Sequence, residues 1–229
     1  MRHLFKASLA VFFKDLRSEL RTRYALNALL LFAASTAVAV SLGVGGFLGI
    51  QRDNEALLIQ SALLWIALLF AALNGLARSF IHEEETRTTL GLRLAAPALA
   101  VYLGKFLFNL VLLVALDGVT SLLFIVFVHI EVGNVGLFVA LMAAGNLCLA
   151  TATTILAAII ARASFKGTLF AVLAFPLLVP PLIVAIQGTA PALAGAPWST
   201  GYDALRALLA YAVATFVASL MLFRFVWDS

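Results

Sequence analysis

The longest polar interruption of this apolar chain is residues 78–105, between two long apolar runs. The stretch has three consecutive acids, a threonine-rich turn, and a short segment of leucines with one arginine that stops at a proline. A plain solvated loop would need no ordered amphipathic segment, so the pattern predicts a short helix that binds a partner protein. The residues predicted to contact that partner are Glu83, Glu84, Glu85, Thr89, Leu90, Leu92, Arg93 and Pro97.

Asp117 is a second candidate, because it is the one acid placed midway along a predicted membrane span. A carboxylate in hydrocarbon is costly unless it is neutralised or paired, and such residues mark ion or substrate pathways. Two interpretations stay open: a protonated carboxyl that only bridges helices, and a group that takes part in translocation. Asparagines and threonines elsewhere in the apolar runs are expected to hydrogen-bond between helices.

The sequence lacks the residue patterns that catalytic sites and metal sites require. A phosphate-binding loop needs Gly-x-x-x-x-Gly-Lys-Ser/Thr, but here Lys105 is followed by Phe106. The histidines share no metal-ligand spacing, and Cys148 is the single cysteine of the chain. The sequence therefore predicts no catalytic residue, no metal site and no directly bound cofactor.

Composition places the whole chain in a membrane. Of its 229 residues, 64% are hydrophobic and 11% are charged, whereas soluble domains have roughly 45–50% apolar and 25% charged residues. The net charge is +4, but the basic residues crowd the ends of apolar runs, which a membrane topology explains without a nucleic-acid partner. We expect an all-α integral membrane protein that forms one domain, residues 1–229.

Six apolar runs are each long enough for a transmembrane helix, which needs about 20 residues. The fifth run contains Pro176, Pro180 and Pro181, which are expected to kink or break it. The predicted spans are 27–49, 57–80, 102–128, 135–161, 168–187 and 204–226.

Residues 2–23 predict an amphipathic helix that lies on the membrane rather than crossing it. An apolar stripe at helical spacing is backed by lysine and arginine, as in helices that bind an anionic lipid surface. The residues assigned to this interfacial helix are Phe5, Leu9, Phe12, Phe13, Leu16, Arg17 and Arg21.

The distribution of basic residues predicts the orientation. All of the 15 Lys and Arg residues except Arg52 and Arg206 fall on one side of the six spans. Cytoplasmic loops carry the excess of Lys and Arg in membrane proteins. Both termini and residues 78–105 are therefore expected in the cytoplasm.

The 78–105 stretch resembles the membrane subunits of ABC exporters of the ABC-2 type. Those subunits end their second span with acids, continue with a short coupling helix and a proline, and open the third span with Leu-Gly-Lys. Many of them carry Glu where this chain has Gly91. The resemblance implies a cytoplasmic coupling loop on which a separate ATPase subunit docks and hydrolyses ATP. The matching residues are Glu83-Glu84-Glu85, Thr89-Leu90, Pro97 and Leu103-Gly104-Lys105.

A closer resemblance is to the CcmB family, the haem exporter permease of cytochrome c maturation. It covers nearly the whole chain and rests on residues 17–32, Trp65, residues 78–80, residues 102–105 and the proline-interrupted run 175–182. The resemblance implies two permeases with two copies of the ATPase CcmA, together with CcmC and the small protein CcmD. It also implies that ATP hydrolysis releases the haem-loaded chaperone CcmE, and that CcmC supplies the haem-ligating histidines.

Three other functions remain open on the residues alone. ABC exporters of drugs, lipids or glycans share the loop pattern, so they would keep the architecture and change the cargo. An ion-coupled transporter would use Asp117 and need no ATPase. The sequence shows neither the second intramembrane charge nor the internal repeat that are typical of such transporters. A passive scaffold within a larger membrane complex would tolerate changes in the 78–105 stretch.

Overall fold

The computed structural model describes residues 2–48, 53–76, 83, 88–161 and 166–228. Over these ranges the protein is helical, with short connecting loops and no strand. This confirms the prediction of an all-α protein. The helices are α1 (Arg2–Thr22), α2 (Tyr24–Leu48), α3 (Asn54–Leu76), α5 (Thr89–Ala95), α6 (Ala98–Leu123), the π-helical turn η1 (Phe124–Val128), α7 (Val135–Ala161), α8 (Lys166–Leu193), the 3-10 turn η2 (Trp198–Gly201) and α9 (Tyr202–Asp228).

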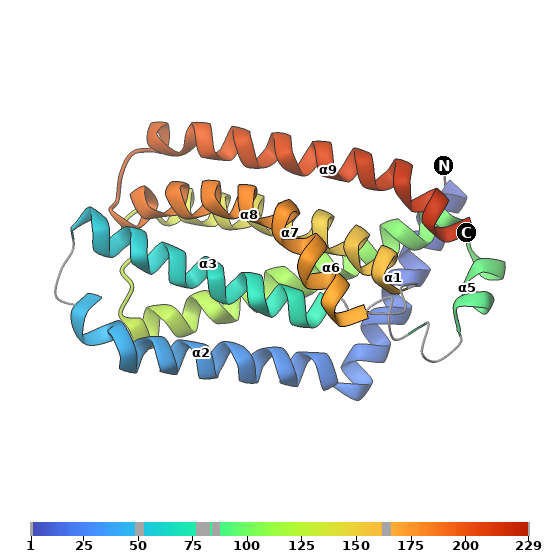
Figure 1. Ribbon diagram of the computed structural model, residues 1–229, viewed down its shortest axis with the longest axis horizontal. Helices are drawn as coiled ribbons and strands as arrows, with labels where there is room; N and C mark the ends of the chain where they lie inside the picture. The colour runs from blue at the N-terminus through green and yellow to red at the C-terminus, as the bar shows by residue number, and fades with distance from the viewer. Residues whose placement is uncertain (1, 49–52, 77–82, 84–87, 162–165, 229) are drawn as a thin grey trace.

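The long helices α2, α3, α6, α7, α8 and α9 lie along one axis, and successive helices run in opposite directions (Figure 1). The helices α1 and α5 lie at one end of this bundle, together with both chain termini (Figure 1). We call this the α5 end, and we call the opposite end the far end. The short helix α5 and the N-terminal helix α1 therefore share one end of the molecule.

Five of the six predicted spans coincide with helices that are long and apolar enough to cross a bilayer. The apolar part of α2, Asn27–Gly43, is shorter within the described residues, so the first predicted span stays a prediction. The five helical stretches are Asn54–Leu73, Ala98–Val128, Val135–Ala161, Leu173–Leu193 and Trp198–Trp227.

Helix α7 forms the centre of the bundle and packs against α3, α6, α8 and α9. The indole of Trp65, on α3, lies against Gly145 of α7, where an added Cβ would come within 2.0 Å of the ring. The Trp65 Nε1–H donates to Thr189 Oγ1 of α8 at 2.9 Å. This buried side chain thus fixes the spacing of three helices.

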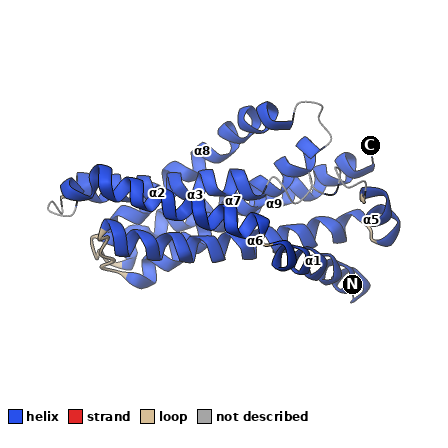
Figure 2. Ribbon diagram, turned by 90° about the horizontal axis from the view of Figure 1, so that it is seen from below, coloured by secondary structure: helices blue, strands red, loops and turns tan. Residues whose placement is uncertain are grey.

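The prolines of the fifth span do not break its helix. Helix α8 is continuous from Lys166 to Leu193, although Pro176, Pro180 and Pro181 lie inside it. Its first turns diverge from the rest of the bundle (Figure 2). Pro181 has no N–H for the carbonyl one turn earlier, that of Leu177, and the hydroxyl of Tyr211 on α9 donates to that carbonyl instead. A neighbouring helix therefore replaces the missing donor, as prolines in membrane helices require.

The two loops described at the far end bind each other. Asn134 caps α7, because its Oδ1 accepts from Leu137 N at 3.1 Å, and its Nδ2 donates to Ala196 O at 2.8 Å. A Cβ on Gly133 would lie 2.5 Å from the Cα of Gly195, whose φ of +79° favours glycine. These contacts tie the start of α7 to the segment that joins α8 and α9.

Candidate functional site at the α5 end

Helix α5 is a single short helix set between a turn and a proline. The Thr88 N–H donates to Glu83 O at 3.0 Å, and the chain then turns into α5. Ala96 is extended, and Pro97 begins α6 by accepting hydrogen bonds on its carbonyl from Ala100 N and Val101 N. The predicted short helix before a proline is therefore present, with bounds close to those expected from the sequence.

One side of α5 is attached to the end of α9. Leu92 packs against a cluster that contains Val101, Phe223 and Trp227. The Cζ atom of Arg93 lies 5.4 Å from the centroid of the Trp227 ring, which is a cation–π contact. The two side chains therefore hold α5 to the C-terminal turns of α9.

The other side of α5 faces outward. Leu94 is 91% exposed, Ala95 is exposed, and a Cβ on Gly91 would meet no atom within 4 Å. Residues 91, 94 and 95 lie on one face of a helix, away from the side that carries Leu92 and Arg93. Leu94 was not among the residues predicted to contact a partner. The leucines alternate along the sequence, but residues two positions apart point to different sides of a helix, so Leu92 and Leu94 have different surroundings.

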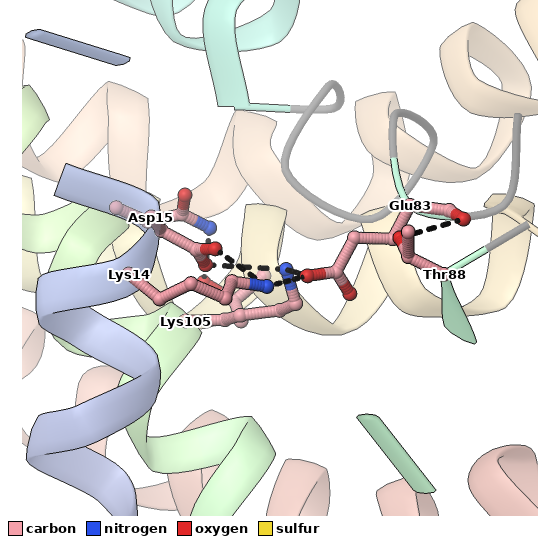
Figure 3. Close-up of polar contacts among 7 residues, drawn as sticks. Lys14, Asp15, Glu83, Thr88 and Lys105 are labelled. Carbon is pink, nitrogen blue, oxygen red and sulfur yellow. Dashed lines mark hydrogen bonds and ion pairs between the residues drawn. The ribbon is translucent and has the colours of Figure 1, made fainter. Parts of the chain in front are cut away.

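Four charged side chains meet beside α5 (Figure 3). The Nζ of Lys105, on α6, lies 3.2 Å from Asp15 Oδ2 and 3.2 Å from Glu83 Oε1. Lys14 donates to Glu83 and lies 3.1 Å from Asp15, its neighbour on α1. We call Lys14, Asp15, Glu83 and Lys105 the ion cluster. Its two positive and two negative charges balance.

The ion cluster is largely shielded from solvent. The side chain of Lys105 is 0% exposed, those of Glu83 and Asp15 are nearly buried, and that of Lys14 is 48% exposed. The shielding arises because α1 crosses α6 closely. At the crossing, a Cβ added to Gly104 would lie 2.7 Å from Ser8 O. Buried charges of this kind are tolerated only when they are paired.

The surroundings of Lys14 favour its charged form. Burial would lower the pKa of Lys14, but the hydrogen bond to Glu83 and the charges of Asp15 and Glu83 outweigh that effect. The net result is a pKa raised above the ordinary value of 10.5. Lys14 is therefore cationic at physiological pH, and it contributes one of the positive charges that neutralise Glu83.

The family model described as CcmB protein matches residues 6–226, which include α5 and the whole ion cluster. The chain belongs to the CcmB family. Membership makes it a transport permease rather than an enzyme, and a component of the haem exporter of cytochrome c maturation that works with other Ccm components. No curated protein and no solved structure gives a significant match.

Family membership bears on the cargo that the residues left open. CcmB proteins serve haem export, so the family favours that cargo over a drug, lipid or glycan. The apolar helices and the family together make the chain a multi-pass membrane protein.

The predicted docking residues of this CcmB chain lie in different surroundings. Glu84 and Glu85 fall outside the described residues, as do the side chains of Thr89 and Leu90 within α5. Glu83 lies inside the ion cluster, whereas Pro97 is exposed at the start of α6. Their role in docking stays a prediction, and the outward face of α5 adds Leu94 to them.

The predicted apolar stripe of α1 is divided between two surfaces. The helix itself runs over Arg2–Thr22 and packs on α6, with Ser8 and Val11 buried at the contact. An interfacial role for the outward surface stays a prediction. Phe12 and Leu16 pack partly against the core and Leu9 is half-buried, whereas Phe5, Phe13, Leu20, Arg17 and Arg21 are exposed.

Asp117 lies between α6 and α7, away from the ion cluster. Its Oδ2 accepts from Asn146 Nδ2 at 2.7 Å, and its Oδ1 accepts from Ser121 Oγ at 3.1 Å. Two turns nearer the α5 end, Asn109 Nδ2 donates to Thr154 Oγ1 at 2.9 Å. These contacts form a polar seam that joins α6 to α7, and a part of Asp117 in translocation stays a prediction.

The described residues do not assemble a metal-binding group. No three His, Cys, Asp or Glu side chains within the described ranges are placed to hold a metal ion. His129 is exposed after η1, in the left-handed conformation with φ 57°, and His82 lies outside the described residues. In this family haem is the cargo of the exporter, which makes it a substrate rather than a resident cofactor.

Proposed function

We propose that this CcmB-family protein is the membrane permease of an ATP-driven complex for haem delivery, and that a CcmA-like ATPase docks on residues 83–97. The observation that carries the proposal is the outward face of α5. Leu94 is almost fully exposed there, while Leu92 and Arg93 attach the opposite face to α9. An exposed leucine on a firmly attached short helix suits insertion into an apolar pocket of a partner.

The attachment of α5 explains how such docking would act on the membrane spans. A force applied at Leu94 would reach α9 through the contact between Arg93 and Trp227. It would reach α6 through Leu92, which packs near Val101. The permease would therefore respond by rigid movement of helices, and ATP would be hydrolysed in the partner chain.

The orientation proposed for the complex follows the distribution of charge. Exposed Lys6, Arg17 and Arg21 lie on α1, at the end that carries both termini. We infer that this end is cytoplasmic and that the membrane is the bacterial inner membrane. In intact spheroplasts, an impermeant maleimide should label a cysteine at Asp203, at the far end, and miss one at Gly91. The reverse pattern would overturn the orientation.

The remaining partners are inferred from the family. We infer a dimer of permeases with two ATPase subunits, joined by CcmC-like and CcmD-like membrane proteins, that acts on a CcmE-like haem chaperone. Anionic lipid would bind α1 through Phe5, Phe13 and the exposed arginines. Haem would be ligated by the CcmC-like partner, and this chain would supply movement.

The docking proposal is tested by truncating Leu94 in the co-expressed complex. Burial of a leucine contributes roughly 1.5–3 kcal/mol, so Leu94→Ala should weaken retention of the ATPase by about tenfold or more. Leu122→Ala is the matched control, since Leu122 is also exposed but lies at the end of α6 that is farther from α5. The measurement is the ATPase recovered per permease after purification. Equal recovery from the two variants would contradict the proposal.

A further inference from the structure

The ion cluster connects three segments that are distant in sequence. Lys14 and Asp15 belong to α1, Lys105 belongs to α6, and Glu83 precedes α5 (Figure 3). Lys105 is 0% exposed, so no partner protein can reach it. Its ammonium group therefore serves contacts within the chain, and it pairs with carboxylates on two other segments.

A continuous set of contacts leads from α5 to this lysine. The N–H of Thr88, the residue before α5, donates to the Glu83 carbonyl at 3.0 Å. The Glu83 side chain then pairs with Lys105 at 3.2 Å and with Lys14. A displacement of α5 would therefore act on Glu83, and through it on α6 and α1 together.

The charges of the ion cluster make its geometry depend on Glu83. If Glu83 moved away, Asp15 would remain to both lysines as a carboxylate of the described residues, at 3.1 Å from Lys14 and 3.2 Å from Lys105. That arrangement would leave the fully buried ammonium of Lys105 with weaker neutralisation, which is unfavourable. A shift of α1 that exposes Lys14 further or brings Asp15 closer would relieve it. The ion cluster thus makes the position of α1 depend on the position of Glu83.

We propose that Lys105 is a positioning residue through which movement of α5 is converted into movement of α1 relative to the bundle, an inference that rests on the proposed docking of an ATPase on α5. Removal of the Lys105 charge leaves α5 and its outward face in place. The ATPase should still bind, and its action should no longer move α1.

The experiment measures the position of α1 in the complex co-expressed with the CcmA-like ATPase and the other Ccm components. Spin labels are placed on cysteines at Arg17, exposed on α1, and at Val135, exposed at the start of α7 at the far end. Cys148 is buried and leaves the labelling to the introduced residues. The distance between labels is compared with and without ATP, and retention of the ATPase is measured on the same samples.

Four variants separate charge from shape. Lys105→Met removes the charge and keeps an aliphatic stem, and Lys105→Arg restores a cation. Asp15→Asn combined with Lys105→Met removes one charge of each sign, so the ion cluster stays neutral and this variant decides the result if Lys105→Met fails to fold. Lys6→Met is the matched control, because Lys6 is an exposed lysine of α1 outside the ion cluster.

The expected result is a distance shift with ATP in the wild type, Lys105→Arg and Lys6→Met. The shift should be lost, with normal ATPase retention, in Lys105→Met and in the variant that combines Asp15→Asn with Lys105→Met. A full shift in either of those variants would overturn the inference, and so would a wild-type complex that retains the ATPase but shows no shift. Failure of the wild type to retain the ATPase would instead overturn the proposed function.

Discussion

At the scale of single residues, Gly145 determines how closely α3 and α7 approach. A Cβ at this position would lie 2.0 Å from Trp65 Cη2, within the ring contact that joins the two helices. Trp65 has little freedom to withdraw, because it is fully buried and donates a hydrogen bond to Thr189. A single methyl group would therefore have to displace a helix.

We predict that Gly145→Ala lowers the free energy of unfolding by about 1–3 kcal/mol or more, which is the usual cost of overpacking a core. Gly118→Ala is the control, since a Cβ there meets no atom within 4 Å. It should be neutral or stabilising, because alanine favours a helix over glycine by about 0.8–1.0 kcal/mol. Denaturant unfolding in detergent, followed by circular dichroism, measures both. Equal losses would contradict the packing described for Trp65.

Asp117 offers a test between a structural and a transport role. Asparagine can replace its contacts if the Asn146 amide turns over, since Asn146 Oδ1 is buried without a hydrogen-bond partner in the structure. Alanine would leave the donors of Asn146 and Ser121 unpaired, at a cost of about 1–3 kcal/mol. We predict that Asp117→Asn keeps both stability and cytochrome c formation, and that Asp117→Ala loses stability. A stable Asp117→Asn protein that forms no c-type cytochrome would assign Asp117 to transport.

The residue types of the α5 end could be recognised in the sequence, but the direction in which each side chain points could not be predicted. The acids, leucines and proline of residues 83–97 were recognisable from residue types alone. Leu94 and Leu92 differ because α9 ends beside one face of α5, and that contact joins residues far apart in the chain. Lys105 stood in a recognisable Leu-Gly-Lys motif, but its burial depends on α1 crossing at Gly104, which no local pattern indicates.

At the scale of elements, α8 and α9 depend on each other. Pro181 removes the hydrogen bond to Leu177 O, and Tyr211 of α9 donates to that oxygen. Cys148 of α7 also donates to the Leu208 carbonyl of α9 at 3.1 Å. Side-chain donors thus bind carbonyls of neighbouring helices in this region, and the prolines are accommodated by the bundle rather than by α8 itself.

This dependence predicts a coupling between two substitutions. Tyr211→Phe should cost about 0.5–1.5 kcal/mol of unfolding free energy, the typical value of one hydrogen bond. In a Pro181→Ala background the cost should shrink, because the alanine introduced there supplies its own N–H to Leu177 O. In the control background, Pro180→Ala, the cost of Tyr211→Phe should be unchanged, since position 180 pairs with another carbonyl. Identical costs in all three backgrounds would rule out this role of Tyr211.

The elements themselves were largely predictable because each apolar run is long and uninterrupted by charge. The predicted span 135–161 has the same bounds as α7. The predicted span 102–128 ends at the same residue as η1, which continues α6. The prolines were expected to kink or break the fifth span, and α8 is not broken. Proline rules for an isolated helix do not include donors on a neighbouring helix, such as the hydroxyl of Tyr211. Whether α2 crosses the membrane in full stays a prediction.

At the scale of the whole molecule, the α5 end carries the features that a partner could use. The bundle places both termini, α1 and α5 together (Figure 1), and the ion cluster joins the last two to α6. At the far end, the loop before α7 binds the segment that joins α8 and α9. The chain belongs to the CcmB family, whose members are permeases that work with other Ccm components in haem export.

The most direct test of the account is site-specific photo-crosslinking on α5 in membranes that contain the co-expressed ATPase. A benzophenone amino acid at Leu94 should capture the ATPase, because Leu94 points away from the bundle. The same probe at Leu92 should capture only other parts of this chain, because Leu92 packs near α9. Capture of the ATPase from position 92 and not from position 94, or from neither, would contradict the proposed docking on the outward face of α5.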